Sequence, residues 1–312
     1  RVVVSPGPKR TGPKSMKRLI ALVAASIFSA GLAVAAEIPL VLVDVMRAGP
    51  STGIASKTEQ SDVNIAIYGS HGDAPRVVMA PISVADCIKT GEYAIYVAEW
   101  LQVPVIVLSD QALGQATTVI DPVADRPSPL KRRTNGAAAT PFKRYAIGPD
   151  PVTPMPLPGT PGREWVAEGL THNEAGLPAS GAGVHVAQIN KRAKKIARFN
   201  PNGYWGETWG DSDTAVLAFG STVGPVREAA RRLTASGHPI RVIALRVLSP
   251  LPMEHIARAL QGVRRLIVVE QNHGAQLYHH LIGQKAIPAS AESVARPGPL
   301  PFRPSEIASY VV

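Results

Sequence analysis

Cysteine is nearly absent from this sequence. Its 312 residues include a single cysteine, Cys87. One thiol cannot form a disulfide within the chain, and an iron–sulfur cluster needs about four thiolate ligands. Any such cluster that works with this protein would therefore be held by another chain. Cys87 lies in an apolar stretch, which predicts a small buried side chain and not a nucleophile.

Aromatic residues are also scarce, at 5% of the chain, whereas proline (29) and glycine (27) are frequent. This composition favours α/β layers packed by Ala, Val and Leu, with long loops, over an aromatic-rich β-sandwich. A chain of this length can hold two domains of roughly 100–200 residues each.

Acidic residues are missing before Glu37. Six of the ten net positive charges lie in this leader, at Arg1, Lys9, Arg10, Lys14, Lys17 and Arg18. A positive balance can indicate a nucleic-acid or membrane surface. Because most of it belongs to one end of the chain, we interpret it as a solvated tail and expect no nucleic-acid partner.

Residues 16–36 have the pattern of a secretory signal, with two basic residues, an apolar run and small residues at the end. The run is shorter than the about 20 residues of a membrane span, so no span is expected. A buried Ala-rich helix leading into the next strand would give the same pattern. Residues 1–15 precede Met16, which counts against export. We therefore interpret residues 1–36 as a signal-like leader, or as a segment joined by a gene fusion, on a cytoplasmic protein.

Residues 37–120 have the pattern of a parallel α/β sheet. Apolar, β-branched runs at 38–45, 76–81 and 103–109 predict strands, and 84–101 predicts a helix. The run at 38–45 is almost continuous, which is typical of a strand buried on both faces.

The rest of the chain divides into a linker and a second domain. Residues 121–212 are Pro-rich, apart from a helix predicted at 184–199. Residues 213–312 predict a small α/β domain. Its expected strands are 214–219, 240–245 and 266–270, and its expected helices are 225–236, 252–260 and 275–284.

Three further patterns are weaker. The basic run 191–195 predicts a helix face that docks on acidic protein surface. The glycine-rich turn 220–224 follows a strand, so it could bind phosphate or allow close packing. The polar residues His172, Asn173, Glu174 and His185 do not have metal-ligand spacing, so no metal site is expected.

The loop after the first strand is the most informative stretch. Loops at the carboxyl ends of parallel strands are where α/β proteins bind ligands. Arg47 offers a planar fork for a carboxylate, and Thr52 and Ser56 offer hydroxyl groups. A structural turn in which Arg47 pairs with Asp44 or Glu59 is an equal alternative.

Residues 47–62 read RAGPSTGIASKTEQSD. They resemble the R-G/A-G-P-S-T-G-x-P-T-K-T-E-Q-x-D loop of the alpha subunits of 2-oxoacid:ferredoxin oxidoreductases, especially the 2-oxoglutarate synthase type. Further similar stretches follow in order at 71–75, 80–81, 98–99, 104–110, 142–145, 158–159, 169–176, 191–195, 220–224 and 270–276. The resemblance covers roughly residues 30–312.

This resemblance implies a thiamine-pyrimidine-type domain, here partial, followed by a transketolase C-terminal-like α/β domain. It implies thiamine diphosphate shared with a beta subunit, coenzyme A as co-substrate, and an iron–sulfur cluster on the partner chain. Arg47 would face the substrate carboxylate, with Thr52 and Ser56 beside it. The usual Pro-Thr of the loop stands here as Ala55-Ser56.

The sequence also departs from the family. The glutamate that activates the aminopyrimidine ring lies well upstream of the loop in such domains, and no acid precedes Glu37. No catalytic residue is therefore assigned to this chain, and its half sheet is expected to expose apolar edges unless a partner covers them.

Three functions follow as hypotheses. The first is an alpha subunit for CoA-dependent oxidative decarboxylation of a 2-oxoacid, with 2-oxoglutarate preferred, that works with a beta subunit and ferredoxin. The second is an inactive truncated subunit or assembly module. The third, indicated only by the leader, is an exported protein of unrelated role.

Overall fold

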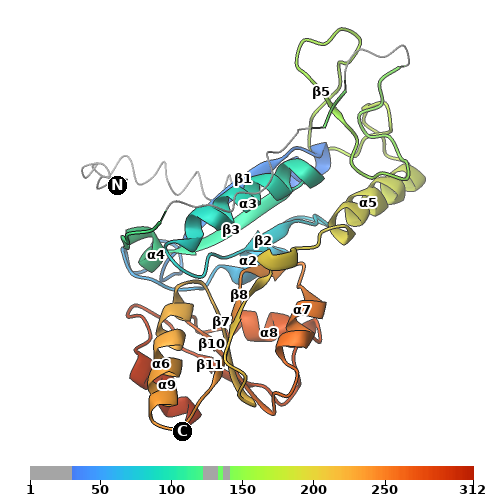
Figure 1. Ribbon diagram of the computed structural model, residues 1–312. Helices are drawn as coiled ribbons and strands as arrows, with labels where there is room; N and C mark the ends of the chain where they lie inside the picture. Colours follow the sequence, from blue (N-terminus) through green and yellow to red (C-terminus); the bar gives the residue numbers. More distant parts are fainter. Residues whose placement is uncertain (1–29, 122–132, 136–140) are drawn as a thin grey trace.

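A computed structural model of the chain describes residues 30–121, 133–135 and 141–312 (Figure 1). Two sheets, each with helices packed against it, lie next to each other, and a loop-rich lobe extends from the first. We call residues 30–204 the N-terminal region and residues 206–312 the C-terminal domain. The α/β fold class is confirmed. No helix in the described ranges is both long and apolar enough to cross a membrane.

The first sheet has the strand order β1-β3-β2-β9. The parallel strands are β1 (Leu40–Met46), β3 (Pro104–Asp110) and β2 (Val77–Met79). The fourth, β9 (Val247–Ser249), belongs to the C-terminal domain and pairs antiparallel with β2. Its helices are α2 (Val63–Tyr68), α3 (Asp86–Leu101) and α4 (Gln111–Gln115).

The prediction for the first strand was wrong about its burial. All seven residues of β3 are buried, because β3 lies between two strands. In contrast, β1 is the edge strand among the described residues, and its Val43 and Val45 side chains are 64% and 44% exposed. We expected a partial first domain to expose an apolar sheet edge, and the described residues have such an edge at β1.

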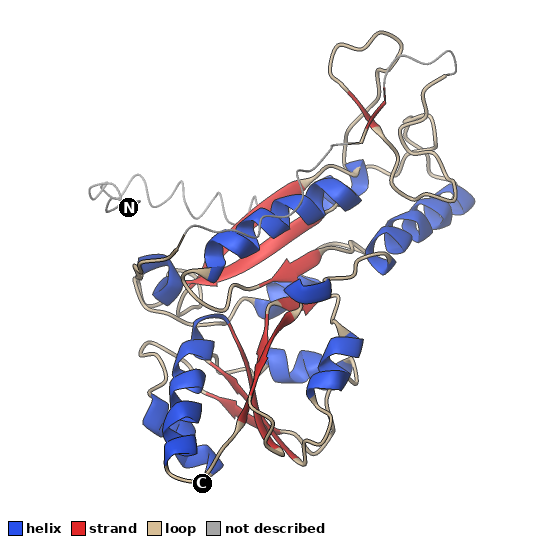
Figure 2. Ribbon diagram, in the orientation of Figure 1, coloured by secondary structure: helices blue, strands red, loops and turns tan. Residues whose placement is uncertain are grey.

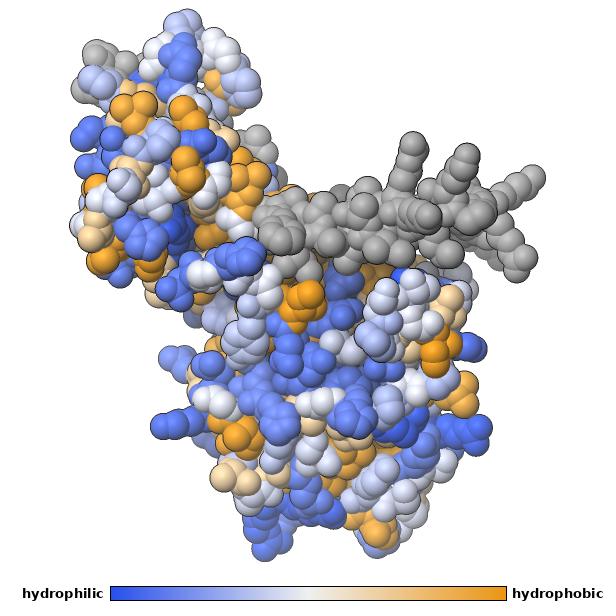
Figure 3. All heavy atoms as spheres, turned by 180° about the vertical axis from the view of Figure 1, so that it is seen from behind, coloured by the Kyte–Doolittle hydropathy of each residue, from blue (hydrophilic) through white to orange (hydrophobic). Residues whose placement is uncertain are grey.

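The lobe contains α5 (Ala182–Ala197) and two short strands, β4 (Thr134–Asn135) and β5 (Met155–Pro156). A helix at 30–36 leads into β1, and its Ala30, Ala33 and Ala36 are buried. These residues thus pack as a buried Ala-rich helix. Figure 3, seen from behind, shows apolar side chains gathered on the lobe. Exposed examples there are Ile147, Leu157, Val166, Leu170, Leu177 and Val186.

The C-terminal domain contains the second sheet, in the order β11-β10-β7-β8-β6. Its strands are β6 (Gly206–Trp209), β7 (Thr214–Phe219), β8 (Arg241–Leu245), β10 (Arg265–Glu270) and β11 (Glu292–Ala295). Its helices are α6 (Val223–Ala235), α7 (Met253–Ala259), α8 (Gln276–Gly283) and α9 (Pro304–Val311), with short 3-10 turns at Asn202–Tyr204 and Gly220–Thr222. Figure 2 shows helices on both faces of this sheet.

The two sheets share one hydrophobic core. Leu217 and Phe219 of β7 point to the side of α7 and α8, and they belong to the same buried cluster as Met46, Ile106 and Leu108 of the first sheet. Val216 and Ala218 point to the other side and pack with α6 and α9. The two domains are thus fixed to each other by apolar packing as well as by β9.

Candidate functional site

The loop at 47–62 begins where β1 ends. The register of β1 with β3 places Met46 opposite Asp110. Because the two strands are parallel, this loop and the start of α4 lie at the same carboxyl edge of the first sheet. That edge is where ligands bind in α/β sheets.

Backbone hydrogen bonds close the loop on itself. The amide of Ala48 donates to the carbonyl of Lys57 at 3.0 Å, and the amide of Ile54 donates to the carbonyl of Ala48 at 3.0 Å. Gly53 has φ +47°, and a Cβ there would lie 1.8 Å from the Ala48 oxygen. Only glycine fits this position. The tip of the loop is therefore held in a fixed shape while it projects into solvent.

Arg47 is half-buried, and its guanidinium makes no hydrogen bond or ion pair with another described residue. The structural alternative required a pair with Asp44 or Glu59, and neither pair forms within the described ranges. The carboxylate of Glu59 instead accepts a hydrogen bond from the amide of Gly298 at 2.9 Å. Arg47 is thus placed at the sheet edge with its donors available.

The two hydroxyl residues of the loop differ in exposure. Thr52 is half-buried and Ser56 is exposed, and neither side chain bonds to a described residue. Ser56 has φ +60°, a conformation in which a β-branched residue would be strained. Ile54 in the same loop is 49% exposed, close in sequence to the open edge of β1. The loop therefore presents polar groups next to an apolar surface.

Two carboxylates at this edge of the sheet belong to the site, and sequence reasoning considered Asp44 only as a partner for Arg47 and gave Asp62 no role. Burial, and then the neighbouring Asp62, raise the pKa of Asp44 to about 6. Burial and the charge of Glu59 raise the pKa of Asp62, while Arg47 lowers it. An acid within the apolar run of β1 was the signal that could have identified Asp44. Asp62 thus lies close enough to disfavour the charged form of Asp44, and Arg47 lies close enough to favour the charged form of Asp62.

The end of the loop docks on the C-terminal domain through Gln60, which is fully buried. Its side-chain amide donates to the carbonyl of Phe219 at 2.8 Å. Its side-chain oxygen accepts from the hydroxyl of Thr222 at 2.8 Å and from the amide of Gln271 at 2.9 Å. Gln60 therefore joins the two domains, and the base of the loop is anchored.

The turn at Gly220 packs closely against the first sheet. Gly220 has φ +58°, and a Cβ there would lie 2.6 Å from Nε2 of Gln60. The amide of Ser221 donates to Oδ2 of Asp110 at 3.0 Å. Of the two interpretations of this turn, the structure shows packing between domains.

The stretch after β10 serves the same junction. The side chain of Gln271 donates to the carbonyl of Thr58 at 3.0 Å, and that of Asn272 donates to the carbonyl of Gln60 at 3.1 Å. Glu270 is buried and accepts the amides of Leu277 and Tyr278 at the start of α8. Several of the family-like stretches thus build the support of the loop.

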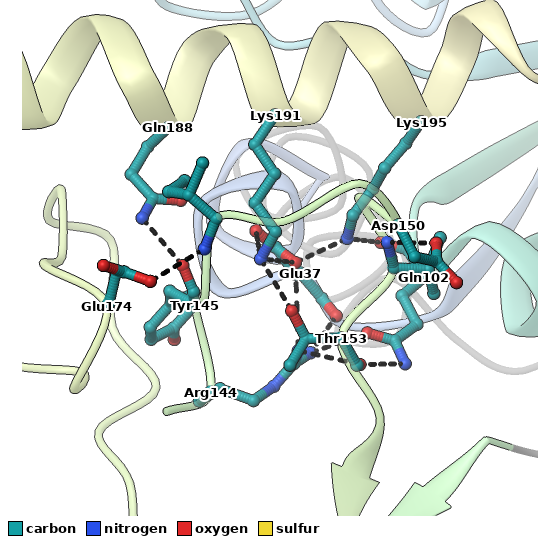
Figure 4. A network of polar contacts seen from close by, with 12 residues as sticks. Glu37, Gln102, Arg144, Tyr145, Asp150, Thr153, Glu174, Gln188, Lys191 and Lys195 are labelled. Carbon is teal, nitrogen blue, oxygen red and sulfur yellow. Dashed lines mark hydrogen bonds and ion pairs between the residues drawn. The ribbon is translucent and has the colours of Figure 1, made fainter. Parts of the chain in front are cut away.

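The opposite end of β1 carries a buried ionic network (Figure 4). Glu37 is 1% exposed, and Lys191 and Lys195 of α5 reach it at 2.9 and 2.6 Å. Arg144 donates to the carbonyl of Glu37 at 2.6 Å and to Oε1 of Gln102 at 3.0 Å. Burial is the main cause that lowers the pKa of Lys195 to about 8. Two of the four basic side chains in the run thus pair with one buried carboxylate of their own chain, whereas Lys194 is exposed.

The polar residues around His172 have structural contacts. Its ring stacks on Tyr145 with 4.6 Å between ring centroids, and Oδ1 of Asn173 accepts the amides of Ala175 and Leu177. Glu174 accepts the amide of Ile147 at 2.9 Å. Among the described residues, His, Cys, Asp and Glu side chains nowhere gather in threes as metal ligands would.

Cys87 is half-buried, so the prediction of a buried side chain was only partly right. Its thiol donates to the carbonyl of Ser83 at 3.4 Å. Burial, and then the carboxylates of Asp86 and Asp110, raise the pKa of this thiol to about 11. A nucleophilic cysteine needs a lowered pKa, so this group is not activated.

Comparisons with known proteins agree with this architecture. Residues 25–191 match the family model described as pyruvate flavodoxin/ferredoxin oxidoreductase, thiamine diphosphate-binding, and residues 203–282 match the transketolase C-terminal domain. The chain is 34% identical to the 2-oxoglutarate oxidoreductase subunit KorA of Mycobacterium tuberculosis, over 90% of this chain and 43% of that protein. It is 31% identical to the 2-oxoglutarate synthase subunit KorA of Methanothermobacter marburgensis, over 90% of this chain and 75% of that subunit.

A solved structure is also similar. It is the 2-oxoglutarate:ferredoxin oxidoreductase of Magnetococcus marinus with 2-oxoglutarate, coenzyme A and succinyl-CoA bound, at 31% identity and a TM-score of 0.81. The match covers 96% of this chain and 55% of that one. The chain thus spans about half the length of this structure and less than half of the M. tuberculosis relative.

Proposed function

This chain belongs to the alpha subunits of the 2-oxoacid:ferredoxin oxidoreductases, and from that premise we propose that it takes part in the CoA-dependent oxidative decarboxylation of 2-oxoglutarate. The reaction would release CO2, transfer the succinyl group to coenzyme A, and pass two electrons to ferredoxin. The observation that carries this proposal is the guanidinium of Arg47, which stands at the carboxyl edge of the sheet near Asp62 but makes no hydrogen bond or ion pair with a described residue.

Arg47 would bind a carboxylate of the substrate. A guanidinium forms two parallel hydrogen bonds to a carboxylate, which fixes both its position and its orientation. Thr52 and Ser56 would add hydrogen bonds from the same loop. Because the loop is closed on itself and anchored by Gln60, these groups are held in place before the substrate arrives.

The described residues do not supply every contact that thiamine diphosphate needs. The aminopyrimidine ring requires a carboxylate well upstream of the loop, and Glu37, the first acid of the sequence, is buried among three cations at the opposite end of β1. No chemical step through the cofactor therefore follows from this chain alone. On our proposal a beta subunit holds most of the cofactor and the iron–sulfur cluster, and the reaction takes place in the assembled enzyme.

The exposed apolar side chains support assembly with such a subunit. Val43 and Val45 of β1 and Ile54 of the loop lie open beside Arg47. Exposed apolar side chains next to a binding loop are typical of a site completed by another chain.

The test is co-expression with a 2-oxoglutarate-type beta subunit, followed by an assay of viologen reduction that depends on 2-oxoglutarate and CoA. Arg47→Gln is expected to lower kcat/KM for 2-oxoglutarate by about 10- to 100-fold, since a hydrogen bond to a charged group contributes about 1.5–3 kcal/mol. Lys57→Gln removes an exposed charge from the same loop and serves as the matched control. Equal losses in both variants would contradict the role of Arg47.

A second function is favoured by one observation, the enclosure of Glu37. A chain that binds the beta subunit but cannot activate thiamine would be an assembly module. Formation of a stable complex without any 2-oxoglutarate-dependent reduction would support this alternative over the first.

A further inference from the structure

A second concave region lies away from the Arg47 loop, at the end of the first sheet where β1 begins. It is a cavity of about 830 Å³ between the helix at 30–36, the stretch 65–74, the loop 169–171 and α5. This volume is within the range of small-molecule binding sites. The cavity is distinct from the proposed active site. It lies at the amino ends of the parallel strands, whereas the Arg47 loop lies at their carboxyl ends.

Helix α5 has two inward faces with different contacts. One face carries Lys191 and Lys195, which the Glu37 network satisfies. The other face carries His185, Ile189 and Arg192, which line the cavity. The spacing of four and three residues places these three side chains on one stripe of the helix.

Arg192 is buried without a partner. Its side chain is nine-tenths buried (9% exposed), its Nε has no hydrogen-bond partner, and it makes no ion pair within the described ranges. Burial lowers its pKa, and the carboxylate of Glu37 only partly offsets that effect. Glu37 already faces three closer cations, so Arg192 has no carboxylate of its own among the ion pairs of the described residues. An anion in the cavity would stabilise a guanidinium in this state.

The other walls of the cavity complete the description. Ser70 lines it, and its buried hydroxyl also has no partner. Nδ1 of His185 lies 3.2 Å from the hydroxyl of Thr171, which orients the imidazole ring. Asp73 is exposed at the cavity and forms no ion pair with Arg192. Apolar walls come from Leu32, Val34, Ile65, Leu170 and Ile189.

From these contacts we propose that the cavity binds a small amphipathic organic anion, whose carboxylate or phosphate group pairs with Arg192 and whose apolar part lies against the helix at 30–36. A guanidinium binds either group through two hydrogen bonds. The unpartnered hydroxyl of Ser70 supplies a further donor. The apolar walls exclude a purely polar ion as the best ligand, because such a ligand would leave them in contact with water.

The test is a titration of the full chain with four probes of equal chain length: octanoate, octyl phosphate, octanol and octylamine. Calorimetry and thermal melting measure binding. Saturable binding is expected for octanoate or octyl phosphate, and the stronger of the two identifies the head group. Octanol and octylamine are expected to bind at least tenfold more weakly.

Two variants decide whether Arg192 is responsible. Arg192→Met is expected to weaken binding of the anionic probe at least tenfold, while Lys194→Met, which removes an exposed charge from the same helix, leaves it unchanged. The unliganded Arg192→Met chain should melt at the same temperature or higher, because it loses an unpaired buried charge. If that variant does not fold, Ala35→Phe fills the cavity and is expected to abolish binding. Equal binding of octanol and octanoate, equal losses in both charge variants, or no saturable binding would each overturn the proposal.

Discussion

The C-terminal domain and the N-terminal region differ in how completely they cover their apolar residues. The second sheet has α7 and α8 on one face and α6 and α9 on the other, so its strands β7, β8 and β10 are almost entirely buried. The first sheet ends in β1, whose valines are open, and the lobe exposes a further set of apolar side chains. Figure 3 shows apolar side chains of the lobe on one side of the molecule.

This difference indicates where further polypeptide would bind. A sheet with helices on both faces needs no partner to remove its apolar surface from water. An open edge strand beside a binding loop does need one. The comparison therefore predicts that the junction between the two parts stabilises the chain, whereas the open edge of β1 contributes to assembly and little to stability.

The largest effect is expected at the ion pair that crosses the junction. Arg246 of the C-terminal domain donates to both carboxylate oxygens of Asp86 at 2.8 and 2.9 Å, and both side chains are buried. Arg246→Met leaves Asp86 buried without its partner, which should lower the free energy of unfolding by about 3–5 kcal/mol. Denaturant unfolding measures this change.

The control for this pair is Arg264→Met. Arg264 pairs with Asp213 on the surface, and its side chain is 85% exposed. This variant should change the stability by less than about 0.5 kcal/mol. If Arg246→Met unfolds only the first domain, and the C-terminal domain keeps its melting transition, the view of a shared stabilising junction is wrong.

A smaller effect is expected at Gly220. Its positive φ and the nearby amide of Gln60 leave no room for a Cβ. Gly220→Ala should therefore lower the free energy of unfolding by about 1–3 kcal/mol. Gly224→Ala is the matched control, because a Cβ at this helical position meets nothing within 4 Å. That control should be neutral or stabilise the chain by up to about 1 kcal/mol. A neutral Gly220→Ala would show that the two domains can shift apart without cost.

Much of this fold could be predicted from the sequence, and the C-terminal domain more so than the first. The apolar run at 214–219 coincides with β7, because a central parallel strand is apolar along its whole length. The run of β1 looks the same, yet β1 is an edge strand in the part of the chain that the structure describes. Edge position depends on the neighbours of a strand and not on its own residues. For a similar reason β9 was missed, since three residues directly after β8 give no turn signal.

The site was predictable in part. The pattern of the loop identified Arg47 and its position after a strand. The role of Gln60 was not readable, because its partners Phe219 and Gln271 are 159 and 211 residues away in the chain. The pairing of Glu37 with α5 could not be predicted for the same reason, because Glu37 and Lys195 are 158 residues apart. Long-range polar contacts depend on the whole topology.

The pH dependence of stability tests the other end of β1. Lys195 keeps a pKa of about 8 in the folded chain, against 10.5 as its ordinary value. Between these values the unfolded chain binds the proton that the folded chain has released, so stability should rise as the pH increases from about 8 to 10. We expect a gain of about 1–2 kcal/mol for the wild type relative to Lys195→Met, because stability can rise by at most about 1.36 kcal/mol per pH unit for one proton.

Urea unfolding of both proteins at pH 7.5, 8.5 and 9.5 measures this difference. Lys194→Met is the control, because Lys194 is an exposed residue of the same helix. Parallel pH profiles for all three proteins would show that the pKa of Lys195 is not lowered in the folded chain. The network would then be more accessible to water than its geometry indicates.

The smallest effect on stability is expected at the open edge itself. Val43 is 64% exposed, so Val43→Lys removes little buried apolar surface and should change the free energy of unfolding by less than about 0.5 kcal/mol. A lysine on an edge strand opposes pairing with another chain, so the same variant should reduce self-association and binding of a beta subunit. Light scattering and co-purification measure these effects. Leu300→Lys, at a similarly exposed residue of the C-terminal domain, should change neither. If both variants behave alike, the open edge of β1 is no more a docking surface than the covered domain, and the contrast between the two parts carries no functional meaning.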